Sequence, residues 1–135
     1  PSDIDLYQAQ KGIDNAKSAL KDGGSLLLGA KCRMGIGEES FVKLLSSASS
    51  PKDALDRIEK KFGVGYHKAA KMAEVGLWAH TWAVTDLDPK LLESIFIRPF
   101  SSLQTALDEA RKEKGQDAKV LVLLDGSLTI PHVEE

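Results

Sequence analysis

The chain has 135 residues, of which 42% are hydrophobic and 28% are charged, with a formal net charge of -2 at pH 7. Its length fits one domain over residues 1–135 that buries its own core without disulfides or metals, and its near-neutral charge argues against a binder of nucleic acid or membrane surfaces, which would show a basic excess. It holds no apolar run near the roughly 20 residues of a membrane-spanning helix, and its single cysteine fits a reducing, cytoplasmic compartment.

The first half of the sequence predicts three helices and one strand. Asp3 or Asp5 can cap the first helix, whose apolar residues recur at helical spacing until two glycines end it. The short apolar run SLLLGA at residues 25–30 is typical of a strand covered on both faces, which favours a parallel sheet. Two further amphipathic helices follow at residues 38–47 and 51–62.

The second half continues the alternation of helices and strands. In order, it predicts a helix from Tyr66, a strand centred on residues 82–84, a short helix from Asp88, a brief strand at 95–97, a long helix capped by Ser101 or Ser102, and a uniformly apolar strand, VLVLL, at 120–124. This order predicts an α/β fold, a three-layer α/β/α domain with a mostly parallel sheet. Ligands collect beyond the carboxyl ends of such strands, so the loops at residues 31–37, 85–89 and 125–131 are candidate site regions.

The glycine loop after the first strand places Gly35 and Gly37 just ahead of a helix N-terminus, where backbone N–H groups favour an anion. It lacks the third glycine of the dinucleotide fingerprint and the Lys-Ser/Thr pair of a phosphate loop, so a structural turn is the favoured interpretation. Cys32 lies between Lys31 and Arg33, which could lower its pKa. No histidine is near it in sequence to act as a base, so a buried, unreactive thiol is favoured.

The histidines and tryptophans of the chain give no self-contained site. The three histidines, His67, His80 and His132, show no metal-ligand spacing, so no metal site is expected in this chain. Trp78 and Trp82 are expected in the core or at a domain interface.

The first helix carries polar side chains opposite its apolar stripe. At about 100° per residue, Gln8 and Lys11 project away from that stripe, and Tyr7 lies one turn before Lys11. On physical grounds alone this is a solvated face. An amide and an ammonium three residues apart can nevertheless both donate to one carboxylate, which suits the binding of an organic acid.

Four segments together resemble a known family. These are DLYQAQK at residues 5–11, SLLLGAKCRMGIGEESF at 25–41, GVGYHKAAK at 63–71 and VLVLLDGSLTIP at 120–131. In this order they resemble the carboxy-terminal domain of nickel-dependent lactate racemases, and the first segment is the most specific of the four. Because the chain also opens at Pro1 without methionine, we expect it to be the carboxy-terminal domain of a larger two-domain enzyme.

The resemblance implies an isomerase, either a racemase or an epimerase, that acts on a 2-hydroxy acid. In that family a nickel-pincer nucleotide, tethered to a lysine of the amino-terminal domain, accepts a hydride from the substrate while a histidine takes the hydroxyl proton, and the carboxy-terminal domain closes the cleft. Carried over by position, Gln8 and Lys11 would bind the substrate carboxylate, Tyr7 would line the pocket beside the cofactor, and Tyr66 is a possible further pocket residue. No catalytic residue and no cofactor are expected in this chain alone, which would be inactive, and its partners would be its own amino-terminal domain and the small acid.

Two other classes stay open on the residues alone. The chain could be a non-catalytic α/β module that binds a phosphate or nucleotide at the loop between Gly35 and Gly37. It could also be a protein-interaction domain whose polar first helix docks another chain. Covered Tyr7, Gln8 and Lys11 side chains without any cleft would favour that second class.

Overall fold

The computed structural model describes residues 3–134. In chain order its elements are α1 (Leu6–Ala16), a 3-10 turn (Lys17–Ala19), β1 (Ser25–Gly29), α2 (Glu39–Ser47), α3 (Pro51–Lys60), α4 (Tyr66–Gly76), β2 (His80–Val84), α5 (Pro89–Ser94), β3 (Ile97–Pro99) and α6 (Leu103–Lys114). The helix from Tyr66 therefore ends at Gly76, and Trp82 lies within β2, as the sequence predicts. Along the described residues, no helix has both the length and the apolar composition that a membrane crossing requires.

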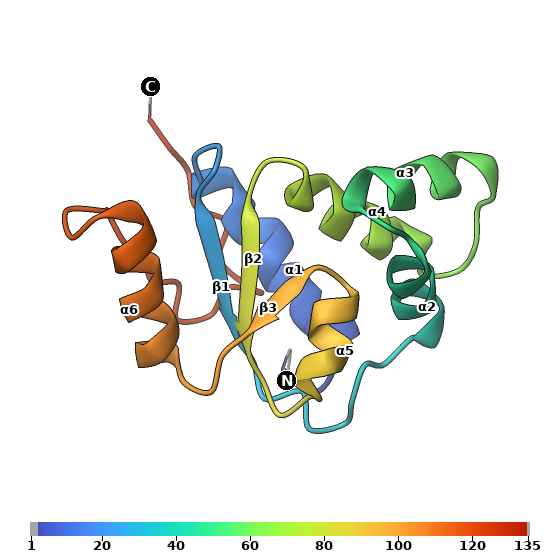
Figure 1. The fold of residues 1–135 in the computed structure, drawn as a ribbon, viewed down its shortest axis with the longest axis horizontal. Helices are drawn as coiled ribbons and strands as arrows, with labels where there is room; N and C mark the ends of the chain where they lie inside the picture. The colour runs from blue at the N-terminus through green and yellow to red at the C-terminus, as the bar shows by residue number, and fades with distance from the viewer. Residues whose placement is uncertain (1–2, 135) are drawn as a thin grey trace.

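The three strands form a parallel sheet in the order β1-β2-β3. Two consecutive residues of β1 face different helices. Leu28 faces α1, since a Cβ atom placed on Gly12 of α1 would lie 3.7 Å from Leu28 Cδ1. Gly29 faces α6, since a Cβ atom placed on Gly29 would lie 3.1 Å from Leu103 Cδ2. Successive strand residues point to opposite faces, so α1 and α6 cover opposite faces of the sheet. Figure 1 shows α1 passing behind the strands, with α2, α3 and α4 gathered on the far side from α6. The α/β fold and its parallel sheet are those the sequence predicts.

The main core lies between the sheet and the helices α1, α2, α4 and α5. Its largest fully buried side chains are Phe41, Leu6, Leu45, Leu92, Ile95 and Ile97. A smaller cluster joins Ile13 of α1 to Leu26 of β1 and Val75 of α4. Trp82 is buried and its ring lies 4.9 Å from that of Phe100, while half-buried Trp78 packs against the smaller cluster, so both tryptophans are packing residues as expected.

The prediction of a strand at residues 120–124 is wrong. This segment has no regular secondary structure, and Leu124 is 98% exposed. A run of apolar residues forms a strand only if a neighbouring strand pairs with it. Among the described residues, β1 pairs with β2 alone. The following residues lie along α1, where Asn15 Nδ2 donates to the carbonyl oxygens of Gly126 at 2.9 Å and Ser127 at 3.2 Å. The loop at 125–131 therefore does not extend a strand of the sheet.

Several element boundaries also differ from the prediction. The helix predicted at 51–62 ends at Lys60, and Phe62 is 78% exposed. The first helix gives way to the 3-10 turn after Ala16, before the glycine pair is reached. The brief strand begins at Ile97, because Phe96 has a φ of 67° and its N–H donates to Glu93 in the turn that ends α5. A φ of this sign lies outside the extended region that regular strand residues adopt.

Candidate functional site

The N-terminus of α1 is fixed at the carboxyl edge of the sheet. Asp5 caps the helix by accepting a 2.8 Å hydrogen bond from the N–H of Gln8. The loop that follows β1 satisfies the two preceding N–H groups of the helix. The N–H of Leu6 donates to the carbonyl oxygen of Gly35, and that of Tyr7 donates to the carbonyl oxygen of Ile36, each at 3.1 Å. The first turn of α1 therefore lies where open α/β sheets bind ligands.

Gln8 and Lys11 are both exposed on α1, whereas Leu6, Ala9 and Ile13 of the same helix are buried. Residues three positions apart in a helix are neighbours on its surface. Within residues 3–134, neither the Gln8 amide nor the Lys11 ammonium forms a side-chain hydrogen bond or an ion pair. The structure thus brings the two donors to one outer face of α1 and leaves them available to a ligand.

Tyr7 is half-buried where α1 meets α2 and α4. Its ring contacts Phe41 edge-on at 5.6 Å between centroids and His67 at 6.4 Å. The ammonium of Lys68 lies 3.9 Å from the centre of the Tyr7 ring and also donates a hydrogen bond to the Tyr7 carbonyl oxygen. Burial lowers the pKa of Lys68, nearby Asp5 opposes that shift, and Lys71 and Lys11 add to it.

Tyr66 is half-buried at the first position of α4. Its ring lies against Gly63, where an added Cβ atom would be 3.0 Å from Tyr66 Cζ. The aromatic ring of α4 that reaches Tyr7 is His67, one residue later. His67 and Lys68 are not among the site residues predicted from the sequence, although both belong to the GVGYHKAAK segment that carries the resemblance. Their contacts with Tyr7 join residues about 60 positions apart, and helical periodicity gives no signal for such a pair.

The glycine loop serves as a structural turn. Gly35 and Gly37 have φ angles of 91° and 79°, which glycine adopts without strain. The loop's carbonyl oxygens accept from α1, and the Glu38 side chain accepts from the N–H of Ser40 at the start of α2. A carboxylate therefore already occupies the anion position at that helix N-terminus.

Cys32 and the histidines do not form a reactive or metal-binding cluster. Cys32 is 2% exposed, and burial, together with Asp5, Asp3 and Asp86, raises its pKa to about 11. Its thiol is therefore protonated near neutral pH, as expected of a buried, unreactive cysteine. Over residues 3–134, no three His, Cys, Asp or Glu side chains lie close enough together to hold a metal ion.

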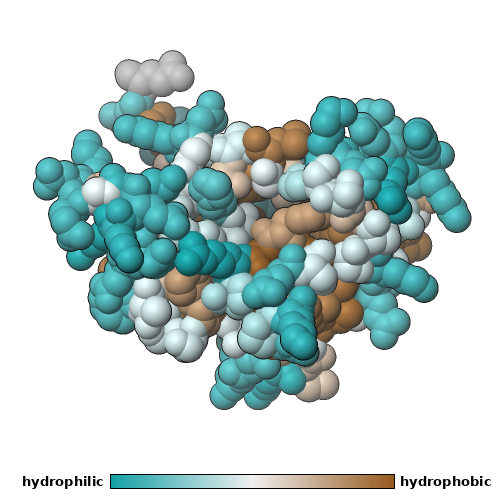
Figure 2. Space-filling model, viewed as in Figure 1, coloured by the Kyte–Doolittle hydropathy of each residue, from teal (hydrophilic) through white to brown (hydrophobic). Residues whose placement is uncertain are grey.

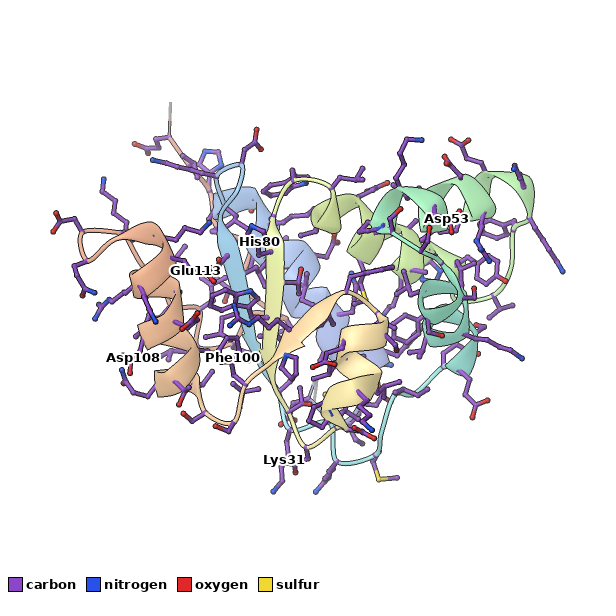
Figure 3. All side chains as sticks on the ribbon, viewed as in Figure 1. Lys31, Asp53, His80, Phe100, Asp108 and Glu113 are labelled. Carbon is purple, nitrogen blue, oxygen red and sulfur yellow. The ribbon has the colours of Figure 1, made fainter. Side chains whose placement is uncertain are left out.

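A hollow of about 390 Å³ lies elsewhere, on the sheet face that α6 covers. It is lined by His80, Trp82, Phe96, Arg98 and Glu113, among others. Figure 2 shows hydrophobic side chains near the middle of this view, between hydrophilic surfaces over α6 and α3. Figure 3 shows His80 at β2 and Glu113 between α6 and the strands. Arg98 spans this face and pairs with Glu109 at 3.4 Å and Glu113 at 3.1 Å, so its charge is already matched.

The fold and the exposed face of α1 together define an α/β domain that offers an amide and an ammonium near the carboxyl edge of a parallel sheet. Comparison with known families matches residues 1–130 to the lactate racemase C-terminal domain. The chain belongs to that family.

Similar proteins agree with this assignment. The chain is 33% identical to the lactate racemase of Lactiplantibacillus plantarum over 131 residues, covering 93% of this chain and 31% of that protein. The lactate racemase of Thermoanaerobacterium thermosaccharolyticum is 28% identical with the same coverage. The solved structure of the latter's apoprotein matches the whole chain with a TM-score of 0.90 at 27% identity, and the chain covers 33% of it. The chain thus spans about a third of the length of the relatives it matches.

Proposed function

We propose that this chain is the substrate-binding, cleft-closing domain of a two-domain, lactate-racemase-like enzyme that acts on a 2-hydroxy acid. The observation that carries the proposal is the pair of exposed, unengaged donors on α1, Gln8 and Lys11, in a chain whose family is the lactate racemase C-terminal domain. The active site would lie between this domain and an amino-terminal domain.

The residues of α1 suit the binding of a carboxylate. The Gln8 amide would donate to one carboxylate oxygen and the Lys11 ammonium to the other, a charge-assisted hydrogen bond. Holding the acid at both oxygens fixes its carboxylate and the position of its C2 carbon, which is part of what a positioned reaction requires. Tyr7 would form the wall of the pocket and exclude water, and Tyr66 would contribute to the pocket only if the domains close over α4.

The nickel-pincer nucleotide that the resemblance implies would be held by the amino-terminal domain. The described residues contain no metal-binding cluster, whereas the exposed donors of α1 fit the acid rather than the metal. When bound, that nucleotide supplies the hydride acceptor. The role left for this chain is to bind, orient and enclose the substrate, so the 135-residue chain alone should not racemise lactate.

The test is racemisation of D- and L-lactate by the intact two-domain protein with its nickel cofactor. Lys11→Met should lower kcat/KM by about 10- to 100-fold, because it removes a charge-assisted bond, and Gln8→Ala should lower it by about tenfold or less. Lys17→Met is the control, since it removes a lysine six residues after Lys11 that already pairs with Asp14 at 2.7 Å. Rates like those of the unsubstituted protein in both Lys11→Met and Gln8→Ala would rule the proposal out.

A further inference from the structure

We propose that Lys68 is a positioning residue for the substrate site: its ammonium holds Tyr7, and with it the first turn of α1, and adds a second positive charge beside Lys11. The inference rests on the proposed function for its substrate, but its structural part can be tested separately. Lys68 lies on α4, 61 residues from Tyr7 in the sequence.

The Lys68 ammonium makes two contacts with Tyr7. Its Nζ atom lies 3.9 Å from the centre of the Tyr7 ring, within the range of a cation–π interaction. The same atom donates to the Tyr7 carbonyl oxygen, which has a second lone pair beyond the one used within the helix. One contact fixes the side chain and the other fixes the backbone, so the direction in which Gln8 and Lys11 leave α1 depends on Lys68.

The charge of Lys68 is not neutralised by an ion pair. Among the described residues, no carboxylate lies within 4 Å of its Nζ atom, and its partners are a ring face and a carbonyl oxygen. The charged groups that act on it are Asp5 before α1, Lys11 on α1 and Lys71 on α4. Of these, Asp5 is the only anion, and its carboxylate already accepts from the N–H of Gln8. A carboxylic acid bound at α1 would therefore meet the fields of two ammonium groups.

Lys71 provides a matched comparison on the same helix. It lies one turn after Lys68 and also reaches α1, but it pairs with the Asp14 carboxylate at 3.0 Å. Its substitution removes a lysine contact between the same two helices without touching Tyr7. Any effect that is specific to Lys68 must therefore come from the Tyr7 contact or from the unpaired charge.

The first experiment follows the tyrosine rings by NMR in the 135-residue chain, which has only two tyrosines. Tyr66→Phe assigns the Tyr7 signal, and the Tyr66 signal reports that each variant is folded. Lys68→Met should shift the Tyr7 ring signals, because an ammonium over the ring face is lost, while Lys71→Met should leave them in place. Lys68→Arg should move them back toward the original position. Unchanged Tyr7 signals in Lys68→Met would overturn the inference whatever the chain binds.

The second experiment measures KM and kcat for lactate in the intact two-domain protein. Lys68→Met should raise KM by about tenfold and change kcat by less than about threefold, because substrate binding is lost rather than chemistry. A merely structural role would lower the amount of active protein, and so apparent kcat, at an unchanged KM. Lys68→Arg should restore KM, and Lys71→Met should not change it.

The outcomes separate the two proposals. If Gln8→Ala and Lys11→Met impair racemisation but Lys68→Met behaves like Lys71→Met, the inference about Lys68 is wrong and the proposed function stands. If Gln8→Ala and Lys11→Met have no effect, the proposed function fails. The Tyr7 signals then still decide whether Lys68 holds the first turn of α1.

Discussion

Gly37 and Tyr7 approach each other so closely that a Cβ atom on Gly37 would lie 2.8 Å from the Tyr7 Cβ atom and 2.8 Å from Asp5 Cγ. The loop after β1 therefore packs against the Asp5 and Tyr7 side chains so closely that only glycine fits at position 37. Gly35, two residues earlier, has a similar φ of 91°, but an added Cβ atom there would meet nothing within 4 Å.

This difference makes a matched pair of substitutions. Gly35→Ala should lower the free energy of unfolding by about 1–2 kcal/mol, the strain of a left-handed residue. Gly37→Ala carries the same strain and should lose about 1–3 kcal/mol more, because the new methyl group displaces Asp5 and Tyr7. Urea denaturation of the 135-residue chain measures both. Equal losses would show that the close packing of loop and helix is absent in solution.

Phe41 packs against Tyr7 from the core, since it is fully buried and its ring contacts that of Tyr7. Phe41→Ala should lower the free energy of unfolding by about 3–5 kcal/mol through lost burial and the cavity left behind. Phe62→Ala is the control, because Phe62 is 78% exposed and its removal should change stability by less than about 0.5 kcal/mol. Similar losses in the two variants would contradict the described core.

The local signals in the sequence predict most of this fold. The cap at Asp5, the first-turn proline Pro51 and the cap at Ser102 each mark a helix that the structure contains. The separation of Gln8 and Lys11 from the apolar stripe also follows from helical periodicity, and their exposure confirms it. These features depend on residues within one or two turns of each other, which is why a sequence alone reveals them.

Features that depend on distant partners could not be predicted. The VLVLL segment at 120–124 has the composition of a buried strand, but a strand also requires a neighbour to pair with, and composition does not supply one. The contact between Lys68 and Tyr7 likewise depends on how α4 crosses α1. A lysine in an amphipathic helix is by default a solvated residue, so nothing local distinguishes Lys68 from Lys71.

The buried thiol of Cys32 predicts a pH dependence of stability. Its pKa is raised from an ordinary value of 9.0 to about 11, chiefly by burial. The folded state therefore holds the proton more tightly, so this contribution is complete below pH 9 and is lost as the pH rises from 9 to 11. Urea denaturation across that range should show a steeper fall for the original chain than for Cys32→Ala, in which the lysine and tyrosine titrations remain. Parallel curves would show that the thiol is not buried.

The Asn15 side chain holds the residues that follow the exposed VLVLL segment against α1. Its amide donates to the carbonyl oxygens of Gly126 and Ser127, and Ser18 donates to that of Pro131 at 3.0 Å. Asn15→Ala should lower stability by about 1–2 kcal/mol and speed amide hydrogen exchange at Leu128, whose N–H donates to Asp125 in the adjoining turn. Ser18→Ala removes only an exposed hydroxyl, which lies 3.0 Å from the carbonyl oxygens of both Asn15 and Pro131, and should have a smaller effect. Equal exchange rates in Asn15→Ala and the original chain would place these residues elsewhere.

The most direct test of the account is the binding of a lactate analogue that carries a methyl group in place of the C2 hydrogen. It keeps the carboxylate and the hydroxyl but cannot give up a hydride, so calorimetry on the intact two-domain protein measures binding without turnover. We predict that Lys11→Met weakens its binding by about 10- to 100-fold and Gln8→Ala by about tenfold or less, with Lys17→Met unchanged. Equal affinity in all three variants would contradict the claim that the first helix of this domain binds the acid.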